Sequence, residues 1–236
     1  KPSEKDPLGS MFIVELFNQT KAPSGLLNLL NGDKNVVNKL IKDDRIKAVS
    51  FVGSTPVAKN IYETAATSGK RCQALGGAKN HALILPDADI DYTTDQLISA
   101  AYGSSGQRCM ALSVAVVFSD IKDEFIQDLE RKVQKLKFGL DDLHSNSFGP
   151  LVSKEHLESV KNYIDMSEGE GARVLVDGRD FLKRKNSNNG YFLGPTIIDN
   201  VSSNMKSYQN EIFGPVLQIM DCLLYTSDAA DESDRV

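Results

Sequence analysis

One short stretch constrains the fold of this chain more than any other. The apolar run Ala48–Val52 is followed at once by Gly53-Ser54-Thr55-Pro56, and the pattern over residues 57–67 then predicts a helix. A proline near the start of a helix, with Ser or Thr just before it, is a good start signal. Strand, tight glycine turn and helix together make the βα unit of a nucleotide-binding sheet, so the sequence predicts an α/β fold.

The rest of the chain continues this mixed pattern. The leucine-rich stretch over residues 26–30 ends in Asn31-Gly32, which predicts a second βα unit upstream of the first. Elsewhere, short apolar runs predict strands, and apolar residues at helical spacing predict helices. The predicted strands cover 83–85, 113–118, 173–176, 197–198 and 216–219, and the predicted helices cover 7–17, 92–102, 120–138 and a segment that begins at Ser153.

Composition excludes several classes of protein. The 236 residues are 41% hydrophobic and 25% charged, which is typical of a globular protein in water. A net charge of -5 argues against non-specific nucleic-acid binding, and no apolar run approaches the ~20 residues that a membrane span needs. Three widely spaced cysteines do not form a disulfide framework and favour a reducing compartment. No Cys/His cluster has zinc spacing, so no metal site is predicted.

Five motifs, in order along the chain, carry a resemblance to a known family. They are Lys1-Pro2-Ser3-Glu4, Phe51-Val52-Gly53-Ser54-Thr55, the stretch over 73–81, Gly106-Gln107-Arg108-Cys109 and Glu211-Ile212-Phe213-Gly214-Pro215. In that order they resemble the cofactor-ribose, phosphate-turn, pre-catalytic, nucleophile and nicotinamide-side segments of aldehyde dehydrogenases. Gly77-Ala78-Lys79-Asn80-His81, together with Arg108 before the cysteine, is similar to the CoA-acylating methylmalonate-semialdehyde branch of that family.

The resemblance implies an aldehyde dehydrogenase-like α/β fold. A partial Rossmann-like coenzyme domain would be followed by an α/β catalytic domain. Residues 1–81 would be the C-terminal part of the NAD-binding domain and residues 82–221 an incomplete catalytic domain. Residues 222–236 resemble translated sequencing-adapter DNA and are expected to be non-native, with a genuine polar tail as the alternative. An N-terminal block, with the asparagine that completes the oxyanion hole, and a C-terminal block are expected to be missing.

Cys109 is the predicted nucleophile. It follows a Gly/Ser turn and precedes an apolar run, so a flexible turn can present the thiol into a cleft. Taken alone, a single cysteine is more often an inert structural residue. The family resemblance implies that its thiolate attacks an aldehyde and becomes a thioester, while its backbone N–H serves as an oxyanion donor.

Arg108 has two predicted roles beside that cysteine. Its guanidinium favours the thiolate form of Cys109, and it can bind the carboxylate of the substrate in a bidentate manner. Without the family context, a surface arginine is an equally good reading.

Ala74 stands where the resemblance places the water-activating glutamate of hydrolytic aldehyde dehydrogenases. Alanine has no proton acceptor and cannot act as a general base, so a thioester on Cys109 would wait for a CoA thiol. A base supplied from elsewhere, or lost activity, are the alternatives. The implied reaction is the NAD-dependent oxidation of methylmalonate or malonate semialdehyde to propionyl-CoA or acetyl-CoA with loss of CO2, a reaction of valine catabolism.

Seven residues are predicted to bind NAD, in three groups along the chain. The first group holds the adenosine ribose, and its carboxylate favours NAD over NADP. In the second group, Gly53 and Ser54 bind the pyrophosphate, and Gly76 allows close backbone passage near the nicotinamide. In the third group, Glu211 holds the nicotinamide ribose, with Phe213 as its packing neighbour. Taken singly, these motifs read as a solvated turn, a helix cap and a strand entry. The groups are Lys1 and Glu4, then Gly53, Ser54 and Gly76, then Glu211 and Phe213.

Two other functions stay open beside the CoA-acylating one: a hydrolytic NAD(P)-dependent aldehyde dehydrogenase, and an inactive fragment that serves only as a binding piece. The predicted partners are a small semialdehyde and CoA, with no nucleic acid and no membrane, and the family implies a homo-oligomer. A bacterial source would imply the cytoplasm, and a eukaryotic source the mitochondrial matrix. His81 is expected to be a satisfied structural histidine, and His156 carries no assignment.

Overall fold

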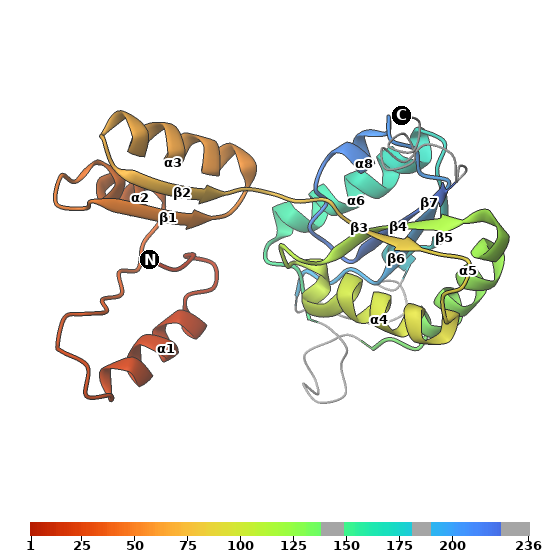
Figure 1. Cartoon of the computed structure of the whole chain (residues 1–236), viewed down its shortest axis with the longest axis horizontal. Helices are drawn as coiled ribbons and strands as arrows, with labels where there is room; N and C mark the ends of the chain where they lie inside the picture. Colours follow the sequence, from red (N-terminus) through yellow and green to blue (C-terminus); the bar gives the residue numbers. More distant parts are fainter. Residues whose placement is uncertain (138–148, 181–189, 223–236) are drawn as a thin grey trace, which may run out of the picture. The chain divides into compact units, whose positions relative to one another are not determined.

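The computed structural model describes residues 1–137, 149–180 and 190–222. The chain forms two compact units, Lys1–Gly77 and a second that begins at Ala78, and each is described by itself (Figure 1). The predicted domain boundary at residue 81 lies inside the first strand of the second unit. Of the predicted tail, only Cys222 is among the described residues. Within the described ranges, no helix has the length and apolar character to cross a membrane.

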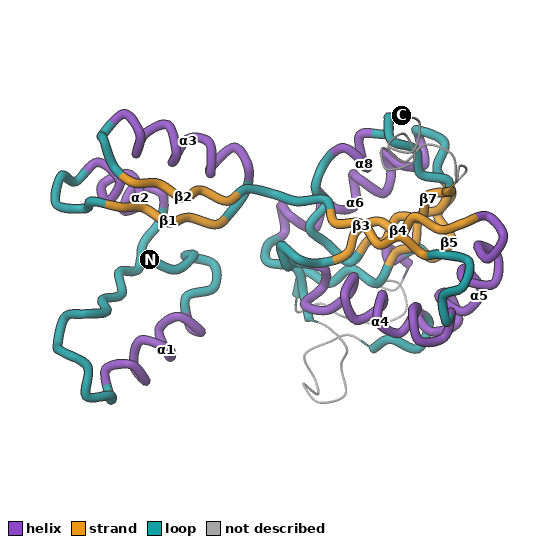
Figure 2. Tube along the Cα trace, viewed as in Figure 1, coloured by secondary structure: helices purple, strands orange, loops and turns teal. Residues whose placement is uncertain are grey.

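The first unit is built on a two-stranded parallel sheet. The strand β1 (Ala48–Val52) pairs with β2 (Arg71–Leu75), and helix α3 (Thr55–Thr67) connects them, so the βα unit predicted from the sequence is confirmed (Figure 2). Two further helices of the first unit, α1 (Leu8–Asn18) and α2 (Lys34–Lys42), precede β1 in the chain. Its small core comprises Ile41, Ile61 and Ala65, with Val37, Val49, Phe51 and Cys72 packed around them.

The second βα unit predicted upstream is wrong. The structure forms no strand over residues 26–32, and the leucines of this stretch are exposed, with 68% of Leu26, 38% of Leu27 and 49% of Leu30 accessible. An apolar run becomes a strand only where a neighbour takes up its backbone hydrogen bonds. In the described part of the chain, no strand pairs with residues 26–32, so nothing takes up their backbone hydrogen bonds as a sheet would.

The second unit is built on a five-stranded sheet in the order β3-β4-β7-β6-β5. Four neighbouring strands are parallel, and β5 pairs with β6 in the antiparallel direction. The strands are β3 (Asn80–Ile84), β4 (Leu112–Phe118), β5 (Arg173–Val176), β6 (Thr196–Asp199) and β7 (Val216–Cys222). The helices are α4 (Ile90–Tyr102), the 3-10 turn η1 (Gly103–Gly106), α5 (Ser119–Val133), α6 (Lys154–Gly169) and α8 (Lys206–Gln209). The helix predicted to reach residue 138 therefore ends at Val133.

Helices cover both faces of this sheet. Helices α4 and α5 lie on one face, and α6 and α8 lie on the other (Figure 1). Each face has its own buried apolar cluster, with Leu97, Phe125 and Leu129 on the α4–α5 side and Val160 and Ile164 on the α6 side. Strands buried on both faces read as continuous apolar runs, and the pattern located β6 and β7 for that reason. The strand predicted at 83–85 instead covers Asn80–Ile84, because β3 alternates between partly buried and exposed residues.

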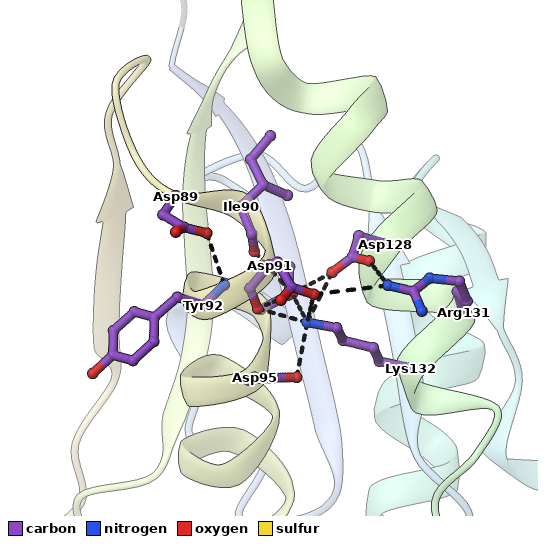
Figure 3. A network of polar contacts seen from close by, with 9 residues as sticks. Asp89, Ile90, Asp91, Tyr92, Asp95, Asp128, Arg131 and Lys132 are labelled. Carbon is purple, nitrogen blue, oxygen red and sulfur yellow. Dashed lines mark hydrogen bonds and ion pairs between the residues drawn. The ribbon is translucent and has the colours of Figure 1, made fainter.

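A network of charges fixes α4 against α5 (Figure 3). The ammonium group of Lys132 contacts three carboxylates. They belong to Asp91 at 2.8 Å, Asp95 at 2.8 Å and Asp128 at 3.1 Å. Arg131 also pairs with Asp128. These contacts join the amino-terminal turns of α4 to the carboxyl-terminal turns of α5.

Candidate active site

Three connecting segments meet at one edge of the second sheet. Strands β3, β4 and β7 are parallel neighbours, so the segments that lead into them lie side by side at their amino-terminal ends. Residues of these segments and of the strand starts, within 78–80, 106–113 and 211–216, line an open pocket of about 330 Å³, including the space at its mouth. Arg108, Cys109, Glu211 and Phe213 all contribute to its wall. The structure therefore brings together the four predicted site residues of this unit.

The turn before Cys109 has an unusual backbone. Ser104, Ser105 and Gly106 have φ angles of 53°, 56° and 68°, in the left-handed region. That conformation costs a residue with a side chain roughly 1–2 kcal/mol, so neighbouring groups must hold the two serines there. The hydroxyl of Ser105 donates to the carbonyl of Gly149 at 2.5 Å. At Gly106, an added Cβ would lie 2.1 Å from the carbonyl oxygen of Gly214, so this turn and the loop before β7 touch backbone to backbone.

Cys109 is a free, exposed thiol in the turn between η1 and β4. The side-chain amide of Asn80 donates to the carbonyl of Cys109 at 2.9 Å and to that of Ala111 at 3.0 Å. Among the described residues, no acceptor receives the backbone N–H of Cys109. The predicted oxyanion donor is thus a free N–H beside an exposed thiol, which is the arrangement that nucleophilic attack on a carbonyl requires.

Gln107 supports this turn and contributes no chemistry of its own to the pocket. Its side-chain nitrogen donates to the carbonyl of Pro150 at 3.3 Å, and its side-chain oxygen accepts from the N–H of Val152 at 2.9 Å. A side chain that both donates and accepts fixes its backbone against the segment before α6. This part of the Gly-Gln-Arg-Cys motif is therefore structural.

Arg108 packs its guanidinium against the carboxyl end of α4. One terminal nitrogen donates to the carbonyls of Ser99 and Ala100, at 2.9 and 3.3 Å. Gly103 leaves room for this, because an added Cβ there would lie 2.5 Å from that same nitrogen. A cation at a helix C-terminus is favourable, so the guanidinium is anchored on the pocket wall. Its predicted contact with a substrate carboxylate stays a prediction.

The loop before β7 carries the other two predicted residues of this unit. Glu211 is half-buried, and Phe213 has a φ of 56°, which is left-handed for a bulky residue. The Nε2 atom of His156 lies 2.7 Å from the carbonyl oxygen of Phe213, and the two rings lie 6.2 Å apart. The imidazole holds the strained residue from the start of α6. The sequence offered no signal for this role, because 57 residues separate the two partners.

Lys79 and His81 contact the segment that leads into the same loop. The Nζ atom of Lys79 donates to the carbonyls of Ser207 at 2.8 Å and Asn210 at 3.0 Å. Burial lowers the pKa of Lys79 from 10.5 to about 8, although the negative charge of Glu211 acts in the other direction and raises it. Both ring nitrogens of His81 have partners, so the expectation of a satisfied structural histidine is confirmed.

In the first unit, three predicted cofactor-binding residues lie at the carboxyl ends of β1 and β2: Gly53 and Ser54, predicted to bind phosphate, and Gly76, predicted to lie near the nicotinamide. Gly53 follows β1, Ser54 is the N-cap residue of α3, and Gly76 follows β2. The hydroxyl oxygen of Thr55 accepts from the N–H of Gly77 at 2.9 Å, and an added Cβ on Gly76 would lie 2.9 Å from that oxygen. The hydroxyl of Ser54 makes no capping bond. Small residues around an open helix N-terminus fit a phosphate group.

Lys1 and Glu4 form an exposed ion pair at the start of the chain. The Nζ atom of Lys1 lies 3.5 Å from a carboxylate oxygen of Glu4. A backbone hydrogen bond, supported by Lys1, keeps the pKa of Glu4 below its ordinary value. Glu4 is therefore an available anion that can accept hydrogen bonds from a ribose. Within the described residues, no cluster of His, Cys, Asp and Glu could hold a metal ion.

Comparison with known proteins adds an independent line of evidence. The sequence profile of the aldehyde dehydrogenase family matches residues 1–230. A malonate-semialdehyde dehydrogenase of Oceanobacillus iheyensis is 48% identical over 222 residues, which are 93% of this chain and 45% of that relative. The crystal structure of methylmalonate-semialdehyde dehydrogenase from Oceanimonas doudoroffii matches with a TM-score of 0.89 and 50% identity, over 99% of this chain and 47% of that one.

A structure from Sinorhizobium meliloti, solved in complex with NAD, matches with a TM-score of 0.88 and 44% identity, over 93% of this chain and 45% of that one. The chain thus spans somewhat under half the length of the relatives that it matches.

Proposed function

Because the chain belongs to the aldehyde dehydrogenase family, we propose that it supplies the NAD-binding face and the nucleophile of a CoA-acylating semialdehyde dehydrogenase. The substrates would be methylmalonate or malonate semialdehyde, and the products propionyl-CoA or acetyl-CoA. One observation supports this most: an exposed cysteine with a free backbone N–H sits in a strained turn against the loop of Glu211. The names of the relatives point to the same substrates.

The first step belongs to Cys109. Its thiolate adds to the aldehyde carbon, and the resulting oxyanion accepts a hydrogen bond from the backbone N–H of the same residue. Expulsion of a hydride then converts the adduct into a thioester. NAD, when bound, supplies the hydride acceptor for this step. Glu211 lies on the wall of the same pocket and would hold the ribose that carries the acceptor ring.

The second step depends on a missing base. The stretch 71–81, which includes β2 and Ala74, contains no Asp or Glu at any position. This conclusion does not depend on which residue of that stretch replaces the catalytic glutamate of a hydrolytic enzyme. Without a carboxylate from this stretch to activate water, the thioester persists until a CoA thiolate attacks it and releases the thiolate of Cys109.

Arg108 would select the substrate. Both semialdehydes carry a carboxylate close to the reacting carbonyl, and a guanidinium on the pocket wall can bind it. After the oxidation, the bond between that carboxylate and the α carbon breaks and CO2 leaves. The electron pair stays on the α carbon as the thioester enolate, which takes up a proton from solvent. One nitrogen of Arg108 is engaged by α4, which fixes the plane of the guanidinium and leaves its remaining N–H groups for the substrate.

The test is NADH formation by the full-length enzyme, with and without CoA. The proposal expects a single burst of NADH, equal to the amount of Cys109, when CoA is absent, and continuous turnover when CoA is present. Cys109→Ser should abolish both. Cys72→Ser is the matched control, because Cys72 packs in the core of the first unit. Continuous release of free acid without CoA would instead identify a hydrolytic enzyme.

A further inference from the structure

Three consecutive residues at the start of β3 contact both loops of the pocket. Asn80 bonds the turn that carries Cys109, Lys79 bonds the segment that leads to Glu211, and His81 bonds the same segment through Tyr208. In the sequence, Lys79 and Asn80 indicate only a branch of the family. Neither the thiol chemistry nor the cofactor contacts described above give them a role.

We propose that Lys79 and Asn80 form a two-armed positioning element, in which Asn80 sets the position of the nucleophile turn and Lys79 sets the position of the Glu211 loop. Neither residue reacts with the substrate. Each acts by fixing backbone carbonyls of the loop that carries a reacting or cofactor-binding group. The kinetic consequences of this inference rest on the proposed function, whereas its structural consequences do not.

The geometry of Asn80 is specific for an amide. Its side-chain nitrogen donates to the carbonyls of Cys109 and Ala111, which flank Met110. Carbonyl oxygens only accept hydrogen bonds, so the NH2 group and not the oxygen of the amide must face them. Two fixed carbonyls, two residues apart, prevent the turn from rotating. An aspartate in the same place would direct a carboxylate at both carbonyls.

The strand pairing explains how Asn80 reaches this turn. Asn80 pairs with Leu112, but the next residue, His81, pairs with Val114, so the register shifts by one residue at this point. An irregularity of this kind redirects the side chain beside it. It occurs where β3 and β4 begin, at the edge of the sheet that forms the pocket.

The geometry of Lys79 is specific for a long donor. Its Nζ atom donates to the carbonyls of Ser207 and Asn210, and the second of these immediately precedes Glu211. These carbonyls lie more than 120 residues away along the chain, so the contact joins two distant segments. His81 strengthens the link, since its Nδ1 lies 2.8 Å from the carbonyl of Lys79 and its Nε2 lies 2.9 Å from the hydroxyl of Tyr208.

The first experiment replaces Asn80 in the full-length enzyme. Asn80→Asp keeps the size of the side chain and removes the donors. We expect kcat to fall by about 10- to 100-fold, because small misplacements of a reacting group have effects of that size. The KM for NAD should stay within about twofold of the wild-type value, because the cofactor loop keeps its own anchor. Asn162→Asp, on the exposed face of α6, is the matched control.

The second experiment replaces Lys79. Lys79→Met keeps the apolar stem and removes the donor, so we expect the KM for NAD to rise about tenfold while kcat changes less than about threefold. Lys79→Arg should restore most of the affinity, since a guanidinium can reach both carbonyls. Lys154→Met, on the exposed first turn of α6, is the matched control.

Hydrogen exchange provides a readout that is independent of the chemistry. Asn80→Asp should speed exchange in residues 107–111, and Lys79→Met in residues 206–213, each without affecting the other segment. Identical kinetic effects of the two variants, or exchange that rises equally across the whole unit, would overturn the two-armed assignment. The milder Asn80→Ser replaces Asn80→Asp if that variant does not fold. If the wild-type enzyme forms no NADH, the proposed function fails, but the exchange pattern still decides this inference.

Discussion

The two units of this chain differ sharply in how well they bury their apolar residues. The unit that begins at Ala78 has a five-stranded sheet with helices on both faces and two buried clusters. The unit Lys1–Gly77 has a two-stranded sheet, one cluster of three buried apolar residues, and a helix, α1, none of whose residues is buried. Two strands alone are marginally stable in water.

This difference separates the two halves of the proposed reaction. The nucleophile and the nicotinamide-side loop lie in the unit with the complete core. The predicted phosphate-binding turn and Glu4, predicted to hold the adenosine ribose, lie in the unit whose helix α1 leaves Leu8, Phe12 and Ile13 exposed. We therefore expect the thiol pocket to be preformed in this chain, and the adenosine side of the cofactor site to depend on further contacts.

Limited proteolysis gives the largest expected contrast. Local stability within a protein ranges from about zero to the full free energy of unfolding, and poorly packed regions open first. Trypsin should therefore cleave the 236-residue chain within the first unit well before the second. The product expected is a resistant fragment that begins at Arg71, Cys72 or Asn80, identified by mass spectrometry.

An activity assay on the same 236-residue chain tests whether the poorly packed first unit also impairs catalysis. We expect no dehydrogenase activity from it, because an open first unit would bind NAD poorly. Equal resistance of both units, or a single cooperative unfolding transition with full activity, would mean that the exposed residues of α1 do not weaken the first unit.

A pair of glycines isolates the effect of packing from that of backbone conformation. Gly106 in the second unit and Gly69 in the first have similar left-handed φ angles of 68° and 64°. An added Cβ would clash with the carbonyl of Gly214 in one case and meets nothing within 4 Å in the other. Gly69→Ala should cost about 1 kcal/mol, and Gly106→Ala at least about 3 kcal/mol.

Hydrogen exchange of the strand amides in each unit measures both costs on the same chain. A Gly106→Ala variant no less stable than Gly69→Ala would show that the nucleophile turn moves away from the Glu211 loop at little cost. The close contact between these two loops would then be incidental to the fold.

Ion pairs provide a smaller contrast of the same kind. In the second unit, Lys122 lies 2.7 Å from Asp199, whose side chain is 3% exposed, and 2.6 Å from Asp221. Lys122→Met should lower the free energy of unfolding of this unit by about 2 kcal/mol. The cost is smaller than for a buried carboxylate left with no partner, because Arg173 remains 3.3 Å from Asp199. In the first unit, Arg45→Met removes a pair with Asp43 that is exposed to solvent, and no measurable change is expected.

Denaturant titration of both variants, monitored by exchange in each unit, measures these effects. If Arg45→Met proved as damaging as Lys122→Met, surface charges rather than burial would hold the first unit together.

The sequence predicted the elements that are supported by local signals. The βα unit around Gly53 combines an apolar run, a glycine turn and a proline near the helix start, and its position was correct. Residues 26–30 have the same apolar character, but strand formation there depends on a partner strand that the local sequence does not encode. Pattern alone therefore cannot distinguish a strand from an exposed apolar coil.

The site shows the same limit. Cys109, Arg108, Glu211 and Phe213 belong to recognisable motifs, and the structure brings them together. The roles of Asn80 and His156 were not predicted, because they depend on hydrogen bonds to backbone carbonyls of residues distant in sequence. Every residue has a backbone carbonyl, so the type of the partner residue does not reveal that a side chain donates to it.

A pH-dependent contrast concerns the charge network between α4 and α5. Burial alone would raise the pKa of Asp128, but hydrogen bonds from Thr94, Arg131 and Lys132 lower it from 3.8 to about 2. Because the folded-state pKa lies below the unfolded one, the carboxylate stabilises the second unit fully above pH 3.8, and this contribution is lost as the pH falls towards 2.

The difference in Tm between wild type and Asp128→Asn should therefore be constant at pH 5–6 and shrink below pH 3.8. Asp123→Asn, on the exposed side of α5, removes the same charge and should show no such narrowing. A difference that stays constant down to pH 2 would mean that the charge of Asp128 does not hold α4 against α5.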